Sequence, residues 1–321
     1  MKLLLIFLLF SSYYISAEYK NTNGVSLNKS FSDMLKWIRA DNETIVSFIE
    51  LSSQWKNIDL NDHDNYTIWI GHSTFLIKTN GITILTDPVF SDRASPFKNI
   101  GPKRLVPPAI NIQDLPTIDF VTISHNHYDH LDISSIKKLS QLNSETIFLI
   151  PAGDLKLFKK NNINKVFEFQ WWESFDDKDF KFTFTPVQHW SKRGLFDRNK
   201  SLWGGWYIEH NKYSLYHAGD TGYSKDFIDT KEKLGPPKYA FIPIGAYDPE
   251  WFMSESHVNP EDAVQIMIDL EAEYSFGMHW GTFKLTDEDT LEPPIRLKEA
   301  AKQANIKNFK SLIPGEVINL N

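Results

Sequence analysis

The amino-acid sequence contains no cysteine in its 321 residues. This absence excludes disulfide bonds, and it also excludes the thiolate ligands that many structural zinc sites use. If the chain is exported, its fold must therefore depend on packing of the core and on bound metal. Any metal site must be built without thiolates.

A strongly basic segment is also missing. The formal net charge at pH 7 is -7, and no stripe of lysines and arginines could follow a nucleic-acid backbone. We therefore expect no nucleic-acid partner.

Long apolar runs are absent as well. Residues 3–10 are all apolar, but about 20 such residues are needed to span a bilayer. Lys2 precedes this run, and the small residues Ser16 and Ala17 follow it. The layout is typical of a secretory signal peptide, residues 1–17, rather than of a buried helix or an uncleaved anchor. The sequence thus predicts export, to a periplasm or out of the cell, with a peripheral position on a membrane as one option.

The apolar residues that are present suffice for a large core. Hydrophobic residues make up 41% of the chain and aromatic residues 14%, which favours one large domain over two small ones. Residues 18–60 are polar with aromatics at loosely helical spacing, so we expect an N-terminal extension that packs on the core. Residues 61–321 are expected to form the main domain. The predicted anchors of the extension are Phe31, Trp37, Phe48 and Trp55.

Short β-type runs begin at residue 66, and further along the chain strands alternate with helices. Asn80 and Gly81 form a strong two-residue hairpin signal. Residues 88–117 hold six prolines and predict a long irregular loop, which is usually functional inside a compact domain. Two successive halves of strands with helices appended predict two packed sheets covered by helices. We expect strands at 66–70, 74–78, 82–86, 118–123, 146–150, 165–169, 180–187, 205–210, 213–217, 239–244 and 274–278, and helices at 134–142, 154–160, from 225 onward and at 260–270.

One segment, residues 124–132, reads S-H-N-H-Y-D-H-L-D and gathers four metal-ligating side chains. In an extended tail after a buried strand, His125 and His127 point the same way. A turn after them would bring Asp129 and His130 to a second position beside the first. A pair of imidazoles suits one cation, and a carboxylate with an imidazole suits a neighbouring one. A chance grouping in a polar loop is the alternative, and the clustering of three histidines disfavours it.

A site for two metals needs further donors from later strand ends, and three residues fit. His189, Asp220 and His279 each follow a predicted strand. Taken singly, each has a structural explanation, as a core histidine, a turn residue and a partner of backbone carbonyls. Together with the motif they complete a ligand set.

In this order of motifs the chain resembles the metallo-β-lactamase superfamily, whose pattern is H-x-H-x-D-H, then a lone His, then a bridging Asp, then a last His. The resemblance implies an α/β fold, an αββα sandwich of two mixed β-sheets packed face to face with helices on the outer faces. It also implies two zinc ions per chain, with iron or manganese as alternatives. By this resemblance one zinc is bound by His125, His127 and His189, the other by Asp129, His130 and His279, with Asp220 and a hydroxide between them.

Further tracts, over about residues 60–315, resemble the N-acylphosphatidylethanolamine-hydrolysing phospholipase D family. That resemblance implies a phosphodiesterase that releases N-acylethanolamine and phosphatidate by attack of a metal-bridging hydroxide on phosphorus. Asp129 would accept the proton or orient the nucleophile. His257 would protonate the leaving alcohol or bind the phosphate, unless it only caps a helix. The tracts are residues 69–74, 86–90, 93–96, 101–104, 124–132, 188–190, 218–223, 243–247, 251–253, 257–260, 279–283 and 291–294.

For some residues the sequence is compatible with more than one role. Asp87 is expected to hold a ligand histidine by its free N–H, or else to cap a turn. His72 could line the site or pack at a strand turn, and we interpret it as structural. A phospholipid substrate implies transient contact with a membrane surface, through aromatic side chains and Lys192 and Arg193, although tryptophans are more often in the core. A lactonase or a glycerophosphodiesterase with a soluble substrate is the alternative function, and a zinc-binding module without turnover is another. The oligomeric state is left open, with a homodimer among the options.

Overall fold

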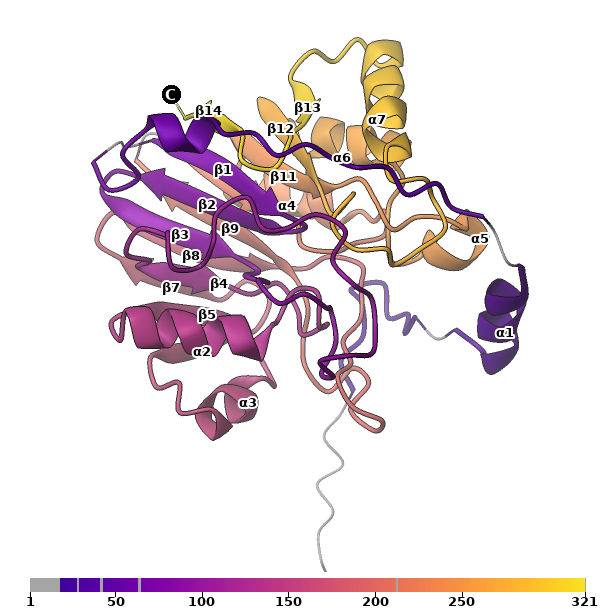
Figure 1. Ribbon diagram of the computed structural model, residues 1–321, viewed down its shortest axis with the longest axis horizontal. Coiled ribbons are helices and arrows are strands. Elements are labelled where there is room, and N and C mark those ends of the chain that lie inside the picture. The colour runs from indigo at the N-terminus through magenta and orange to yellow at the C-terminus, as the bar shows by residue number, and fades with distance from the viewer. Residues whose placement is uncertain (1–17, 28, 41–42, 63–64, 212, 321) are drawn as a thin grey trace, which may run out of the picture.

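The computed structural model describes residues 18–320 apart from 28, 41–42, 63–64 and 212. The predicted signal peptide, residues 1–17, lies outside the described residues. The described chain forms two seven-stranded sheets packed face to face, with helices outside them (Figure 1). This is the αββα sandwich that the sequence predicted.

The first sheet has the order β14-β1-β2-β3-β4-β5-β6, and the second has the order β13-β12-β11-β10-β9-β8-β7. Both are mixed, because each joins antiparallel hairpin strands to parallel strands. The strands are β1 (Tyr66–Gly71), β2 (Thr74–Thr79), β3 (Ile82–Thr86), β4 (Phe120–Thr122), β5 (Ile147–Pro151), β6 (Val166–Phe169), β7 (Ser174–Asp177), β8 (Phe180–Thr185), β9 (Gly205–His210), β10 (Tyr213–His217), β11 (Tyr239–Pro243), β12 (Tyr274–Met278), β13 (Phe309–Ser311) and β14 (Val317–Asn319).

Side chains that alternate along the strands of the first sheet contribute to two hydrophobic cores, one on each face. Successive side chains of a strand point to opposite faces, so β1 places Trp69 between the sheets and Ile68 and Ile70 on the outer face. In β2, Phe75 likewise enters the core between the sheets, and Leu76 joins the outer core. All six residues of β1 are buried, because both faces are covered.

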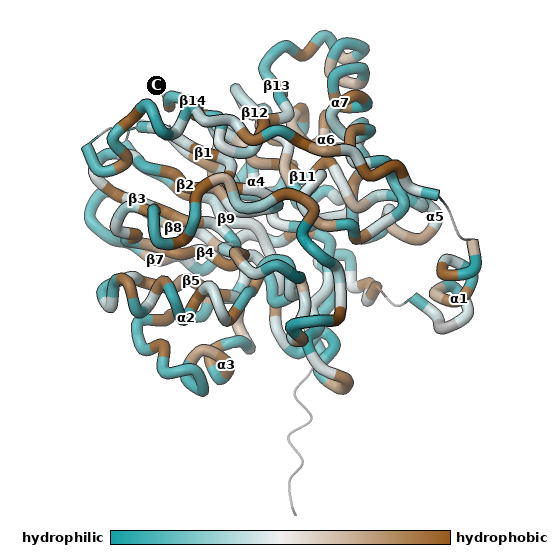
Figure 2. Tube along the Cα trace, in the orientation of Figure 1, coloured by the Kyte–Doolittle hydropathy of each residue, from teal (hydrophilic) through white to brown (hydrophobic). Residues whose placement is uncertain are grey.

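The outer layers are helical. Helices α2 (Ile133–Leu142) and α3 (Leu155–Lys160) cover the first sheet, and α4 (Asp226–Leu234), α6 (Pro260–Leu270) and α7 (Glu292–Gln303) lie with the second (Figure 1). Helices α2 and α7 alternate brown and teal within each turn, as expected for helices with one apolar face (Figure 2). The short helix α5 (Glu250–Met253) precedes α6. Among the described residues, no helix has the length and apolar character needed to cross a bilayer.

The N-terminal segment follows the surface, as expected, with α1 (Phe31–Ala40) and a 3-10 helix, η1 (Gln54–Asn57). Trp37 is anchored, since its Nε1 donates a 2.7 Å hydrogen bond to Oδ2 of Asp287. The prediction of an anchor was wrong for Phe48, which is 83% exposed. Residues 88–117 contain no helix or strand, in agreement with the proline-rich loop that the sequence predicts.

Candidate metal centre

The candidate ligands follow the ends of strands, where the backbone makes sharp turns. His279 directly follows β12 and has φ 62°, and His72 and Asp87 directly follow β1 and β3 with φ 55° and 34°. Residues other than glycine seldom adopt this left-handed region, which costs about 1 kcal/mol or more. The fold therefore holds these three residues in an unfavourable backbone conformation, as functional sites often do.

Three imidazoles form the first part of the cluster, which we call the three-histidine half: His125, His127 and His189. Nε2 of His125 lies 2.8 Å from Nδ1 of His127, and Nε2 of His189 lies 3.3 Å from the same Nδ1. Nδ1 of His189 donates to the carbonyl oxygen of Ser256 at 2.9 Å, which leaves its Nε2 free to bind a metal.

Two imidazoles and an aspartate form the second part, which we call the carboxylate half: Asp129, His130 and His279. Oδ2 of Asp129 lies 3.6 Å from Nε2 of His130 and 3.4 Å from Nε2 of His279. Nδ1 of His130 lies 2.8 Å from Oδ2 of Asp87, as the sequence predicts for a residue that holds a ligand histidine. Asp87 also accepts hydrogen bonds from N and Oγ of Ser124, so it fixes the start of the histidine-rich loop.

Asp220 lies between the two halves. Its Oδ2 is 3.1 Å from Nε2 of His130 and of His279, and 3.9 Å from Nε2 of His125 and of His189. Gly219 makes this approach possible, because its φ is 63° and an added Cβ would lie only 2.6 Å from Cβ of Ser124.

The two halves differ in their protonation. In the three-histidine half, burial lowers the pKa of His127 to about 4, and it lowers those of His125 and His189 well below the usual value, with neighbouring histidines adding to the effect. These imidazoles are therefore neutral at pH 7, which is the form that binds metal.

In the carboxylate half, burial would lower the pKa of the imidazoles, but Asp220 and Asp129 outweigh it. They raise the pKa of His279 to about 9 and that of His130 well above its usual value. Against burial, the histidines in turn hold the pKa of both carboxyls well below their ordinary range. Two buried carboxylates thus require positive charge beside them, which a cation would supply.

The donor set fits divalent metal binding. Four groups of three or four His and Asp side chains have ligand atoms within 4.8 Å of one another, and three of the buried atoms, Nε2 of His130, Nε2 of His279 and Oδ1 of Asp220, have no hydrogen bond of normal geometry. Donors on one tetrahedral zinc lie about 3.4 Å apart, given ligand distances of about 2.1 Å. The separations of 2.8 to 3.6 Å within the halves are close to this spacing.

His257 joins the same cluster, while the alternative of helix capping is wrong. Its Nδ1 lies 3.8 Å from Oδ2 of Asp220, and burial lowers its pKa to about 4, although Asp220 opposes the shift. The cap of α6 is Asn259, whose side chain accepts a 2.8 Å hydrogen bond from N of Asp262.

Sequence reasoning missed two residues of the site. His72 was interpreted as structural, yet its Nε2 lies 3.0 Å from Oδ2 of Asp129 and its ring centroid lies 3.9 Å from that of His279. The available signal was its position directly after a strand. The sequence contains no signal for Asn21, whose Oδ1 accepts a 3.0 Å hydrogen bond from N of His189.

Comparison with known proteins agrees with this geometry. A family model described as the beta-lactamase superfamily domain matches residues 83–280. A solved metallo hydrolase from Ignicoccus hospitalis, Igni18, superposes with a TM-score of 0.61 at 21% identity, covering 80% of this chain and 98% of that one. An isothiocyanate hydrolase from Delia radicum gut bacteria superposes with a TM-score of 0.64 at 17% identity, covering 79% and 99%. The fold and the site thus define a member of the beta-lactamase superfamily.

Relatives with similar sequences indicate which family of the superfamily the chain belongs to. The chain is 40% identical over 266 residues to the N-acyl-phosphatidylethanolamine-hydrolyzing phospholipase D 1 of Caenorhabditis elegans, which covers 78% of this chain and 75% of the relative. It is also 40% identical to a mitochondrial protein of that description from Saccharomyces cerevisiae, but there the match covers 76% of this chain and only 53% of the relative. The chain belongs to this phospholipase D family and is a metal-dependent hydrolase.

Proposed function

We propose that the protein is a dinuclear zinc phosphodiesterase that hydrolyses N-acylphosphatidylethanolamine-like phospholipids to N-acylethanolamine and phosphatidate. The observation that carries the proposal is the position of Asp220, whose Oδ2 is equidistant, at 3.1 Å, from His130 and His279 and, at 3.9 Å, from His125 and His189. A carboxylate shared between two donor groups is the arrangement that two neighbouring cations require. The names of the worm and yeast relatives support the substrate class.

The candidate ligands would hold two zinc ions, with iron or manganese as alternatives, one in each half. When bound, such ions lower the pKa of a shared water towards neutrality and offset the charge of a phosphodiester. Asp129 would orient the attacking water or accept its proton. Its Oδ2 is fixed for this by the 3.0 Å contact with Nε2 of His72.

His257 is our candidate for protonating the leaving alcohol or binding the phosphate. It lies beside Asp220, and its side chain is 15% exposed, so it can meet a substrate. If it protonates the alcohol, His257→Gln should slow hydrolysis of a lipid with an alkyl alcohol leaving group about a hundredfold and leave a nitrophenyl phosphodiester almost unaffected. Equal slowing of both substrates would assign the residue to phosphate binding instead.

The reaction is tested by identifying products from purified, zinc-loaded protein. We expect N-acylethanolamine and phosphatidate from N-acylphosphatidylethanolamine in mixed micelles. The matched substrate is phosphatidylethanolamine without the N-acyl group. Cleavage of neither lipid, with turnover of a soluble lactone or of a deacylated diester, would replace the proposal with one of the two alternative functions.

Export and membrane contact remain parts of the proposal. The leader-like residues 1–17 support export, and a phospholipid substrate requires transient contact with a lipid surface. The tryptophans do not offer that contact as a group, since Trp203, Trp206 and Trp280 are buried in the core. Contact with a lipid surface must therefore involve other side chains.

A further inference from the structure

A large groove borders the histidine-rich loop. It has a volume of about 1340 Å³ and is lined by parts of residues 90–98, by the starts of α2 and α3, and by residues near 193–201. None of the candidate ligands lines it, whereas Asn126 and Tyr128, which alternate with them along the loop, do. The groove therefore shares this loop with the metal centre but none of its candidate ligands.

The groove is cationic although the chain as a whole is acidic. Seven lysines and arginines line it against four aspartates. Three of those aspartates accept hydrogen bonds from the protein itself: Asp132 from Ser134, Asp154 from Asn126, and Asp197 from Gly194. Their charge is thus partly offset before any ligand arrives.

The ammonium groups of the groove lysines are available to a ligand. Some lysines elsewhere form ion pairs, as Lys29 does with Glu255 and Lys231 with Glu271. No side-chain ion pair or hydrogen bond within the described part of the chain engages Lys98, Lys138, Lys156, Lys160 or Lys200. Five free ammonium groups around one hollow favour an anionic ligand with several oxygens.

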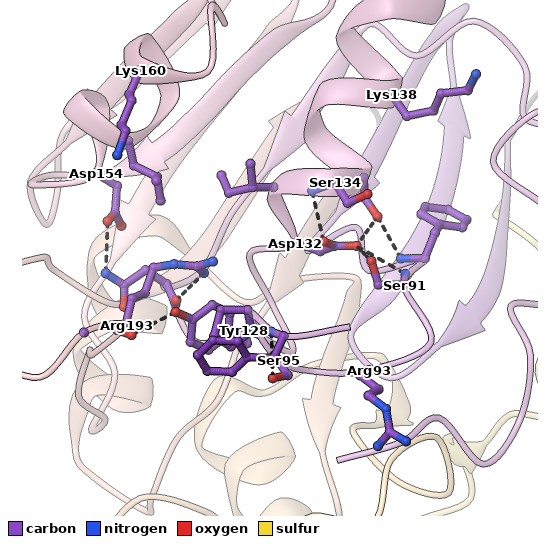
Figure 3. A pocket seen from close by; sticks show the side chains of 18 of the residues that line it. Ser91, Arg93, Ser95, Tyr128, Asp132, Ser134, Lys138, Asp154, Lys160 and Arg193 are labelled. Carbon is purple, nitrogen blue, oxygen red and sulfur yellow. Dashed lines mark hydrogen bonds between the residues drawn. The ribbon is translucent and has the colours of Figure 1, made fainter. Parts of the chain in front are cut away.

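Arg193 connects the groove to the metal-binding loop. Its Nη1 donates to the carbonyl oxygens of Asn126 and Leu131, at 2.8 and 2.7 Å, and its guanidinium lies 4.0 Å from the ring centre of Tyr128 (Figure 3). Figure 3 places Arg193 and Tyr128 together at one side of the hollow, with Asp154 and Lys160 beside them and Lys138 across from them. A ligand in the groove would thus meet residues that fix the loop's backbone.

Exposed apolar side chains flank the groove on two loops. Leu195 and Phe196 are 84% and 86% exposed, and they lie between Gly194 and Asp197, which line it. Phe97, which also lines it, is 62% exposed. A soluble anion would not contact such apolar side chains, whereas in a bilayer they can insert at the level of the headgroups.

We propose that this groove binds the phosphate headgroup of an anionic phospholipid in a bilayer, with Phe97, Leu195 and Phe196 inserted in the interface. The assignment goes beyond the proposed reaction, because binding requires no turnover and the groove contains no candidate ligand. The overall charge of -7 would otherwise repel an anionic surface, so attachment depends on this local basic hollow.

The test is sedimentation of the zinc-loaded protein with vesicles that contain no N-acylated lipid. We expect binding to phosphatidylcholine vesicles that contain some phosphatidate, and little binding to phosphatidylcholine alone. The double variant Lys156→Gln/Lys160→Gln should bind about ten- to thirtyfold more weakly, since each basic residue near the surface contributes about three- to fivefold. The matched control, Lys307→Gln/Lys310→Gln, removes two lysines from a different hollow and should bind as the parent does.

The apolar rim is tested in the same way. Leu195→Ser/Phe196→Ser should weaken vesicle binding at least tenfold, while Ile45→Ser/Phe48→Ser, at positions 65% and 83% exposed in the N-terminal segment, should not. Equal weakening by both lysine pairs, or tight binding of soluble glycerol phosphate that is insensitive to the rim variants, would overturn the proposal. Turnover of the N-acylated lipid in detergent micelles is measured separately, so failure of the reaction and failure of the groove are distinguishable.

Discussion

The two halves of the metal centre use different chemistry to prepare the same kind of site. In the three-histidine half, burial keeps the imidazoles neutral, and His189 is oriented by a backbone carbonyl. In the carboxylate half, Asp129 and Asp220 supply negative charge and His130 is oriented by Asp87. The comparison shows that the carboxylates of one half need positive charge beside them, whereas the other half provides only the lone pairs of neutral imidazoles.

The largest effect is expected from removing the residue that the halves share. Asp220→Asn keeps the shape of the side chain but loses its charge, so both halves should bind metal weakly and phosphodiester hydrolysis should fall about a thousandfold or more. Metal analysis and the hydrolysis rate check this, with a thermal unfolding curve to show that the variant is folded. Hydrolysis at the parent rate would show that Asp220 is not the bridge.

A pair of variants should separate the halves. His189→Ala removes a donor from one half and His279→Ala from the other, so each variant should bind about one zinc per chain instead of about two. Zinc titration by calorimetry would show one binding event where the parent shows two. If both variants lost all zinc, the halves would be a single unit and the contrast drawn between them would not hold.

A smaller effect is expected from the residue that orients His130. Asp87→Asn should lower the rate about ten- to hundredfold, as losses of outer hydrogen-bond partners of metal ligands do. Asp119→Asn is the control, because Asp119 accepts a 2.8 Å hydrogen bond from the backbone of Thr83 and touches no ligand. Both variants should lose some stability, but only Asp87→Asn should lose metal from the carboxylate half. Equal loss of rate in the two would assign Asp87 a purely structural role.

The strands that position the site could be predicted from the sequence. The runs at 205–210, 213–217 and 274–278 and the helix at 260–270 match β9, β10, β12 and α6 in the structure. The missed elements are β7, β13, β14, α5 and α7. β7 has the sequence S-F-D-D at a sheet edge, and α7 begins with Glu292, Pro293 and Pro294, which suggest a loop. Their structure depends on neighbours that a local pattern does not contain.

The candidate ligands could be predicted from their residue types and from their positions after predicted strands. The structure brings His189, Asp220 and His279 together with the histidine-rich loop, as the motif order predicted. His72 was missed because its contact with Asp129 depends on a left-handed backbone turn. Asn21 was missed because its partner lies 168 positions away in the chain. Tertiary packing alone creates such contacts.

The smallest effect on activity is expected at Asp154, a buried aspartate outside the metal centre, which sharpens the comparison. Burial raises its pKa to about 6, with Arg193 only partly opposing the shift and Glu168 adding to it. Asp220 is equally buried and Asp129 is 14% exposed, yet neighbouring histidines lower the pKa of both carboxyls. Burial alone therefore raises the pKa of a carboxyl, and the opposite shift at the metal centre is due to its histidines.

The test of this difference is the stability of Asp154→Asn across pH. In the parent, the folded pKa of about 6 exceeds the unfolded value of about 3.9, so the native state binds more protons between these pH values. The stability that protonation supplies is complete below about pH 4 and is lost as pH rises through about 6. Asp154→Asn cannot ionise, and its amide oxygen can still accept from Asn126 and Ser201. The variant should thus match the parent near pH 4 and exceed its unfolding free energy by up to about 3 kcal/mol at pH 8, measured by urea denaturation. A difference that stays constant with pH would show that Asp154 does not titrate in this range, and burial would then not explain the contrast with the metal centre.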